Sequence, residues 1–179
     1  VGTVPVTQAE LLKALVSEDG HSQADKICDK AQLVALVKHW KDNQQKIVFT
    51  NGCFDIIHAG HVGYLEEAKK QGSRLIVAIN SDDSVKRLKG EGRPINPVDR
   101  RMAVLAGLES VDWVISFDDD TPEALIEKIK PDVLVKGGDY SDDQVVGADI
   151  VKAYGGEVRA LTLYDNLSTT AIVNKIRND

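Results

Sequence analysis

Two histidines three residues apart, His58 and His61, stand in a glycine-containing stretch that follows an apolar run. The run at 46–50 is typical of a β-strand, and we expect a helix to begin at the second histidine. Backbone N–H groups and the positive end of a helix dipole converge at such a junction and favour anion binding. Imidazole N–H groups there can donate hydrogen bonds to phosphate oxygens. The stretch therefore predicts a nucleotide-handling site.

The loop between this strand and helix supplies further predicted contacts. Gly52 permits close approach of the backbone to a ligand, and Gly60 lets the chain turn into the helix. Asp55 is placed to orient an amine, a hydroxyl or a cation, and we assign it to the substrate; the alternative is a turn cap. The residues that we predict to bind the nucleotide here are Thr50, Asn51, Gly52, Cys53, Phe54 and Gly60.

Cationic side chains farther along the chain are candidates for phosphate contacts. Segment 89–97, KGEGRPINP, contains two glycines and two prolines, and we expect a mobile loop that closes over the substrate. Lys89 and Arg93 belong to this loop and Arg101 follows it, although each is alternatively a solvated surface residue. Lys136 ends an apolar strand and precedes two glycines, which favours a place in the site.

Hydroxyl and carboxylate side chains complete the predicted site. A run of three hydroxyls opens the last predicted helix, where one caps the helix and all three form an anion cradle. Asp82 follows a strand and is assigned to ribose or sugar, with a helix cap as the alternative. Gly137 and Asp139 are further predicted substrate contacts. The hydroxyl residues are Ser168, Thr169 and Thr170.

Apolar strands and helices alternate along the part of the chain that must position these residues. We expect strands at 46–50, 74–80, 113–117, 132–136 and 157–163, and helices at 61–71, 82–88, 98–108, 121–130, 146–154 and 168–177. Strands separated by helices of about ten residues imply right-handed βαβ units. The predicted fold is α/β: a Rossmann-like, doubly wound, five-stranded parallel sheet with helices on both faces. Ligands of such sheets bind at the carboxyl ends of the strands.

Composition excludes several classes of function. The 179 residues are 42% hydrophobic and 28% charged, which is ordinary for a globular protein. A formal net charge of −6 argues against a nucleic-acid partner. No apolar run approaches the ~20 residues that span a membrane, and no signal peptide is visible. The two cysteines show neither CxxC nor zinc spacing, so we expect no protein metal site and a cytoplasmic location.

Two motifs far apart in the chain carry a resemblance to a known family. Residues 51–61, NGCFDIIHAGH, resemble the (N/T)GxFDxxHxGH signature of the cytidylyltransferase-like nucleotidyltransferases. Residues 167–170, LSTT, are similar to the (I/L)STT segment of that family. Class I aminoacyl-tRNA synthetases share HxGH, but their KMSKS element does not occur here. The resemblance implies direct nucleotidyl transfer without an enzyme nucleophile, with Mg²⁺ bound mainly through ATP phosphates.

Within that family, residues 46–179 resemble the adenylyltransferase domain of the bifunctional heptose 7-phosphate kinase/heptose 1-phosphate adenylyltransferases. The stretches that carry this resemblance are 50–55, 80–82, 86–90, 93–94, 101–102 and 134–140. It implies ATP and D-glycero-β-D-manno-heptose 1-phosphate as substrates, and ADP-heptose, a lipopolysaccharide inner-core precursor, as product. It marks His58, His61, Lys89 and Lys136 as catalytic and Arg101 as nucleotide-binding. The family usually has Val or Thr where this chain has Cys53, which we interpret as a small packed residue.

The resemblance also shapes the expected domain organisation. The polar segment 17–25 reads as a linker, and Asp29 is a plausible N-cap of the helix that follows. We predict that residues 1–28 are the tail of a preceding domain plus a linker, and that 29–179 form the nucleotidyltransferase domain. Because the only methionine is Met102, we expect an excised part of a longer protein with an N-terminal sugar kinase domain. A homodimer is expected because dimers are common in the family.

Two other functions are open at this point. One is cytidylyl transfer to glycerol 3-phosphate or a similar phospho-alcohol, since the residues alone do not decide the base. The other is a non-catalytic nucleotide-binding or oligomerising module attached to a kinase. The joint presence of His58, His61, Lys136 and the hydroxyl run at 168–170 argues against the second.

Overall fold

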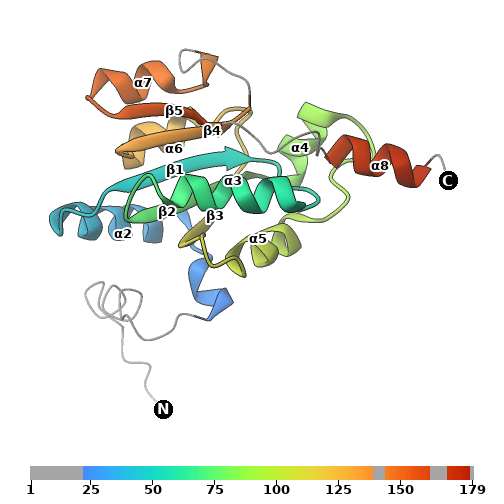
Figure 1. Ribbon diagram of the computed structural model, residues 1–179, viewed down its shortest axis with the longest axis horizontal. Helices are drawn as coiled ribbons and strands as arrows, with labels where there is room; N and C mark the ends of the chain where they lie inside the picture. Colours follow the sequence, from blue (N-terminus) through green and yellow to red (C-terminus); the bar gives the residue numbers. More distant parts are fainter. Residues whose placement is uncertain (1–21, 139–143, 162–168, 178–179) are drawn as a thin grey trace.

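A parallel β-sheet forms the centre of the computed structural model, which describes residues 22–138, 144–161 and 169–177 (Figure 1). Its five strands are all parallel and lie in the order β3-β2-β1-β4-β5. The strands are β1 (Ile47–Gly52), β2 (Arg74–Asn80), β3 (Trp113–Phe117), β4 (Val133–Gly137) and β5 (Glu157–Leu161). The predicted five-stranded α/β sheet is confirmed.

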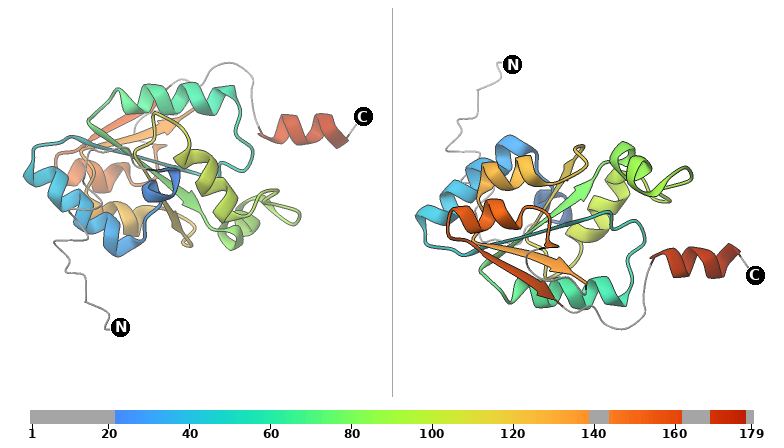
Figure 2. Two further views of the ribbon diagram at one scale, coloured as in Figure 1. Left: turned by 90° about the horizontal axis from the view of Figure 1, so that it is seen from below. Right: turned by 90° about the horizontal axis from the view of Figure 1, so that it is seen from above.

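Helices cover both faces of this sheet, as expected for a doubly wound fold. The helices are η1 (Gln23–Lys26), α2 (Lys30–Asp42), α3 (Ala59–Lys69), α4 (Asp82–Lys89), α5 (Val98–Ala106), α6 (Glu123–Ile129), α7 (Ala148–Ala153) and α8 (Thr169–Arg177). Figure 2 shows α2 and α3 on opposite sides of the strands. Because successive strand side chains point to opposite faces, Phe49 joins one core with α2, α6 and α7, whereas Val48 joins another with α3 and α5.

Helix α2 illustrates how local sequence determines an element. Asp29 caps it as predicted, accepting a hydrogen bond from Gln32 N at 2.8 Å, and the Gln32 side chain accepts from Asp29 N at 2.9 Å. This reciprocal capping satisfies donors that the first turn of a helix leaves unpaired. Trp40, near the other end of α2, stacks at a tilt on Trp113 of β3 with ring centroids 5.9 Å apart. The helix is therefore fixed to the sheet.

The segment just before α2 also packs on the sheet. Cys28 N donates to Val114 O at 3.1 Å, and Lys26 Nζ donates to the carbonyl groups of Leu108 and Val111 at 3.1 and 2.8 Å. Residues 26–28 are thus packed on the described domain, and the domain boundary after residue 28 stays a prediction. Residues 1–21, with the rest of the predicted linker, lie outside the described residues.

The pairing of β1 opens towards its carboxyl end. On one side β1 pairs with β2 along its whole length, from Ile47↔Arg74 to Gly52↔Ile79. On the other side its pairs with β4 are Val48↔Val133 and Phe49↔Leu134. The chain runs from β1 to β2 and β3 in one direction and then crosses to β4 and β5, so β1 and β4 flank the switch point. Ligands of doubly wound sheets bind at the carboxyl ends of such a pair.

Candidate active site

A cavity of about 550 Å³ opens at the carboxyl ends of β1 and β4. Among its lining residues are these predicted site residues: Asn51, Gly52, Cys53, Phe54, Asp55, His58, His61, Lys89, Arg93, Lys136, Thr169 and Thr170. Tertiary folding thus brings together residues that are more than a hundred positions apart. Two other predicted contacts, Asp139 and Ser168, lie outside the described residues.

The two histidines stack on each other in the first turn of α3. Their ring centroids are 3.8 Å apart with an angle of 28° between the planes, and Phe54 packs on His61 at 5.2 Å. Helix α3 begins at Ala59, two residues before the predicted start, so His58 is its N-cap residue. Both Nδ1 atoms are buried and have no hydrogen-bond partner among the described residues. The pair therefore offers polar atoms at a helix amino end, where an anion is favoured.

Burial controls the charge of this histidine pair. It lowers the pKa of His58 and lowers the pKa of His61 to about 4, with the neighbouring His58 adding to the second shift. We infer that His61 is neutral near pH 7 and has one N–H donor and one acceptor. A triphosphate placed against the rings would favour their charged form and raise both pKa values.

The lowered pKa of His61 predicts a pH-dependent stability. Unfolded His61 takes up a proton near its ordinary pKa of 6.5, whereas folded His61 takes it up only near pH 4. Between these values the unfolded chain binds more protons, so the free energy of unfolding should fall as the pH is lowered. We expect a shallower fall over this window in His61→Gln than in the wild type, measured by urea unfolding at several pH values. Equal slopes would contradict the prediction.

Lys136 crosses the opening between β4 and β1. Its Nζ donates to the main-chain oxygen of Asn51 at 3.0 Å and lies 3.3 Å from Asn51 Oδ1. Burial lowers the pKa of this ammonium group, and nearby Lys89 lowers it further while Cys53 opposes the shift. A partly desolvated cation at the end of a strand interacts strongly with an anionic ligand. Lys136 is thus hydrogen-bonded to Asn51 and also lines the cavity.

A smaller chamber of about 150 Å³ adjoins the cavity and is lined partly by Tyr64 and Gly137. The Tyr64 hydroxyl lies 2.6 Å from Thr50 Oγ1, and both side chains are buried. Thr50 therefore supports the floor of the site and is not one of the residues lining the main cavity. Tyr64 was not predicted as a site residue, because nothing in the helical pattern distinguishes its inward hydroxyl from that of an ordinary core tyrosine.

Arg101, predicted to bind nucleotide, lies behind the cavity wall with a relative exposure of 1%. Its Nε donates to Asn96 O at 2.9 Å, and its Nη1 donates to Cys53 O at 2.7 Å and Asn80 O at 2.9 Å. Its Nη2 forms an ion pair with Asp82 Oδ1 at 2.7 Å. Neither Arg101 nor Asp82 is among the residues lining the cavity, and direct ligand contact stays a prediction for both. The structure shows Arg101 joining three segments of the wall.

Other cavity-lining residues come from the ends of β2 and β3, and sequence analysis did not assign them to the site. Asn80 ends β2 next to β1, and its Nδ2 donates to Ser84 Oγ at 3.0 Å. Its position as the one polar residue at the carboxyl end of a buried strand was the signal that would have identified it. Asp120 and Thr121 follow β3, and Asp120 Oδ1 accepts from Arg87 Nε at 2.8 Å.

A metal cage is not formed by the residues that the structure describes. Within 22–138, 144–161 and 169–177, no three His, Cys, Asp or Glu side chains stand together as ligands.

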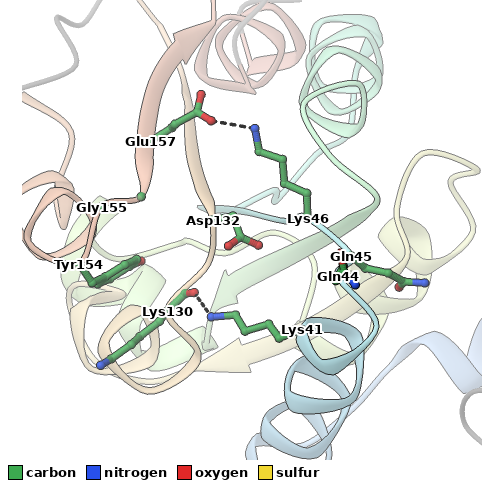
Figure 3. A pocket seen from close by; sticks show the side chains of 10 residues that line it. Lys41, Gln44, Gln45, Lys46, Lys130, Asp132, Tyr154, Gly155 and Glu157 are labelled. Atoms are coloured by element: carbon green, nitrogen blue, oxygen red, sulfur yellow. Dashed lines mark hydrogen bonds and ion pairs between the residues drawn. The ribbon is translucent and has the colours of Figure 1, made fainter.

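A larger cavity, of about 710 Å³, lies at the amino ends of β1, β4 and β5 (Figure 3). Lys46 in this cavity pairs with Glu157 at 2.8 Å, and Lys41 Nζ donates to Lys130 O. Asp132 Oδ2 accepts from Ile47 N at 2.7 Å. Since parallel sheets bind their ligands at the carboxyl ends of the strands, the cavity of about 550 Å³ is the candidate active site.

Comparison with known proteins identifies a family and similar chains. The cytidylyltransferase-like family model matches residues 49–175. The chain is 63% identical over 178 residues to the bifunctional protein HldE of Ectopseudomonas mendocina, and 62% identical over 179 residues to that of Hahella chejuensis. These matches cover 99% and 100% of this chain and 37% of each relative, so the chain spans little more than a third of their length.

Two solved structures are similar in fold. One is a lipopolysaccharide core biosynthesis protein from Thermoplasma volcanium, with TM-score 0.56 and 29% identity, covering 69% of this chain and 99% of that one. The other is a pantoate-β-alanine ligase from Francisella tularensis, with TM-score 0.54 and 19% identity, covering 86% and 78%, and it shows the fold alone. Among the helices that the structure describes, none is both long and apolar enough to cross a bilayer.

Proposed function

Because this chain belongs to the cytidylyltransferase-like family, we propose that it transfers an adenylyl group from ATP to D-glycero-β-D-manno-heptose 1-phosphate. The products are ADP-heptose, a precursor of the lipopolysaccharide inner core, and pyrophosphate. The observation that carries the proposal is the placement of the stacked pair His58 and His61 and of Lys136 in one cavity at the switch point of the sheet. Identity of about 60% to HldE proteins supports the choice of acceptor.

The proposed reaction is a direct displacement. An oxygen of the sugar phosphate attacks the α-phosphorus of ATP, the bond from that phosphorus to the bridging oxygen breaks, and pyrophosphate leaves. The enzyme contributes positioning and stabilisation of charge, which dominate phosphoryl-type transfer. His58 and His61 donate to the phosphate oxygens, and Lys136 balances the negative charge that develops on the phosphates.

The start of α8 and the segment 89–97 also contribute to this arrangement. Thr169 and Thr170 line the cavity at the start of α8, and Thr169 Oγ1 donates to Ile56 O at 3.3 Å. That bond joins the last helix to the histidine-bearing loop and gives the nucleotide a two-sided clamp. Lys89 and Arg93 line the cavity from segment 89–97 and are assigned to the acceptor phosphate.

We also propose that Mg²⁺ accompanies ATP, with the protein supplying few ligands. When bound, the ion withdraws negative charge from the phosphates and stabilises the leaving pyrophosphate. Asn51 and the first turn of α3 would hold the nucleotide. Asp120 also lines the cavity, and its carboxylate is a group of the kind that binds cations.

The nucleotide and the acceptor are tested together. Purified protein is incubated with Mg²⁺ and either ATP or CTP, with heptose 1-phosphate or glycerol 3-phosphate as acceptor, and pyrophosphate release is measured. We expect release only with ATP and heptose 1-phosphate, accompanied by ADP-heptose. Release with CTP and glycerol 3-phosphate would show cytidylyl transfer, and nucleotide binding without any release would indicate a non-catalytic module. Either result would refute the proposal.

The relatives suggest a wider context for the reaction. Since the chain covers 37% of each HldE protein, we propose that it acts within a longer cytoplasmic protein with an N-terminal sugar kinase domain and as a homodimer. The kinase would supply the phosphorylated sugar. Light scattering of the full-length protein tests the dimer, and a monomeric mass would refute it.

A further inference from the structure

One buried carboxylate holds the loop that carries the proposed acceptor-binding cations. Asp55 Oδ2 accepts from Arg93 Nε at 2.7 Å, and its two oxygens accept from Ile95 N at 2.8 and 2.9 Å. Asn96 N donates to Asp55 Oδ1 at 2.9 Å. Every donor in this set belongs to segment 93–96. The carboxylate that we assigned to the substrate by its position in the sequence is therefore engaged with the protein itself.

Burial makes this contact specific. The Asp55 side chain has a relative exposure of 1% and that of Arg93 15%. A buried charge is costly unless it is paired and hydrogen-bonded. The bonds from segment 93–96 therefore stabilise the Asp55 carboxylate, and the same bonds hold the segment in place. Burial alone would raise the pKa of Asp55, but the main-chain N–H groups of Asn96 and Ile95, together with Arg93, outweigh it and hold the pKa below its ordinary value.

The two ends of the loop are held very differently. Asn96 is fixed twice more, since its Nδ2 donates to Asp55 O at 2.7 Å and its oxygen accepts from Arg101 Nε. Gly90 and Gly92 have φ values of 88° and 81°, and a Cβ atom at either position would meet nothing within 4 Å. Left-handed glycines in open space can change conformation at little cost. Segment 89–97 thus combines an open glycine hinge with an anchored end.

We propose that Asp55 is a positioning residue: it anchors segment 93–96 so that Arg93 faces the acceptor phosphate, and it does not itself contact the substrate. The proposal rests on the proposed function for the identity of the acceptor. A guanidinium has five N–H donors, and the bond to Asp55 uses the one on Nε. Asp55 thereby orients the plane of the Arg93 guanidinium, and the terminal amino groups are left to the phosphate.

The test uses Asp55→Asn, which preserves size and removes the charge, with Asp149→Asn on exposed α7 as the matched control. Hydrogen exchange of the peptide covering 93–97 is followed by mass spectrometry, and KM is measured for each substrate. We expect faster exchange in Asp55→Asn and at least a tenfold higher KM for the sugar phosphate, because Arg93 would lose the charged partner that orients it. The KM for ATP should change much less. The control should match the wild type.

Unchanged exchange together with a raised KM for the sugar phosphate would overturn the proposal, because Asp55 would then contact the substrate directly. If Asp55→Asn does not fold, Arg93→Ala removes the same ion pair from the other side, and the same peptide should exchange faster. If the peptide exchanges faster in Asp55→Asn but the wild type does not use heptose 1-phosphate, the anchoring role of Asp55 is supported and the proposed acceptor is refuted. The two proposals therefore fail in distinguishable ways.

Discussion

Replacing His61 by alanine is expected to lower the kcat of adenylyl transfer by about 10²- to 10³-fold, the usual cost of losing one donor to developing charge. His61 stacks on His58 at 3.8 Å in the first turn of α3, inside the cavity, and its Nδ1 has no partner among the described residues. The loss should fall mainly on kcat, because the interaction strengthens as charge moves to the leaving group. Steady-state pyrophosphate release measures it.

Two comparisons separate chemistry from folding in this experiment. His39→Ala removes an imidazole from α2, outside the cavity, and should retain wild-type turnover. Circular dichroism should show that His61→Ala keeps its secondary structure, although loss of the Phe54 contact lowers stability somewhat. Turnover close to the wild-type value in folded His61→Ala would exclude His61 from transition-state binding and contradict the proposed mechanism.

Lys136→Met is expected to reduce kcat/KM for ATP by about 10²-fold or more, since a partly desolvated cation contributes strongly to phosphate stabilisation. Methionine retains most of the volume of the side chain and removes its charge. The change also removes the hydrogen bond from Nζ to Asn51 O, which joins β4 to β1 at the switch point. Turnover and ATP binding are measured together, by pyrophosphate release and calorimetry.

The structural and electrostatic parts of this effect can be distinguished. Lys38→Met, on the exposed side of α2, is the matched control and should leave both quantities unchanged. Thermal unfolding of Lys136→Met reports the loss of the strand-joining hydrogen bond, which is worth about 1–3 kcal/mol when the acceptor stays buried. A large loss of stability with turnover preserved at low temperature would show that Lys136 only joins the strands.

The sequence predicted the sheet accurately where apolar residues form short, uninterrupted runs. The predicted strands 74–80 and 113–117 coincide with β2 and β3, because a strand buried on both faces has a composition that no surface element shares. Helix ends were less accurate. Helix α7 begins at Ala148 and not at 146, because Gly147 adopts a left-handed conformation with φ of 87°. That conformation depends on packing and not on the local pattern.

The sequence by itself determined the family and the α/β fold, and it predicted most of the residues that line the candidate site. The spacing of His58 and His61 and the hydroxyl run before the last helix are local motifs, so they are recognisable without coordinates. Family membership and the five-stranded sheet are confirmed. The placement of His58 and Lys136 at the same edge of the sheet also follows from topology, since parallel strands end on one side.

Only the tertiary structure decided which polar residues face the cavity and which hold its walls. Asp55 and Arg101 belong to family-like motifs, yet Asp55 binds the main chain of 95–96 and Arg101 binds Asp82 and three carbonyl groups. Charged residues at a site can meet a ligand or each other, and their types do not distinguish the two. Apart from Asn96, which is five positions from Arg101, their partners lie about 20 to 50 positions away, so the outcome depends on how the loops meet in space.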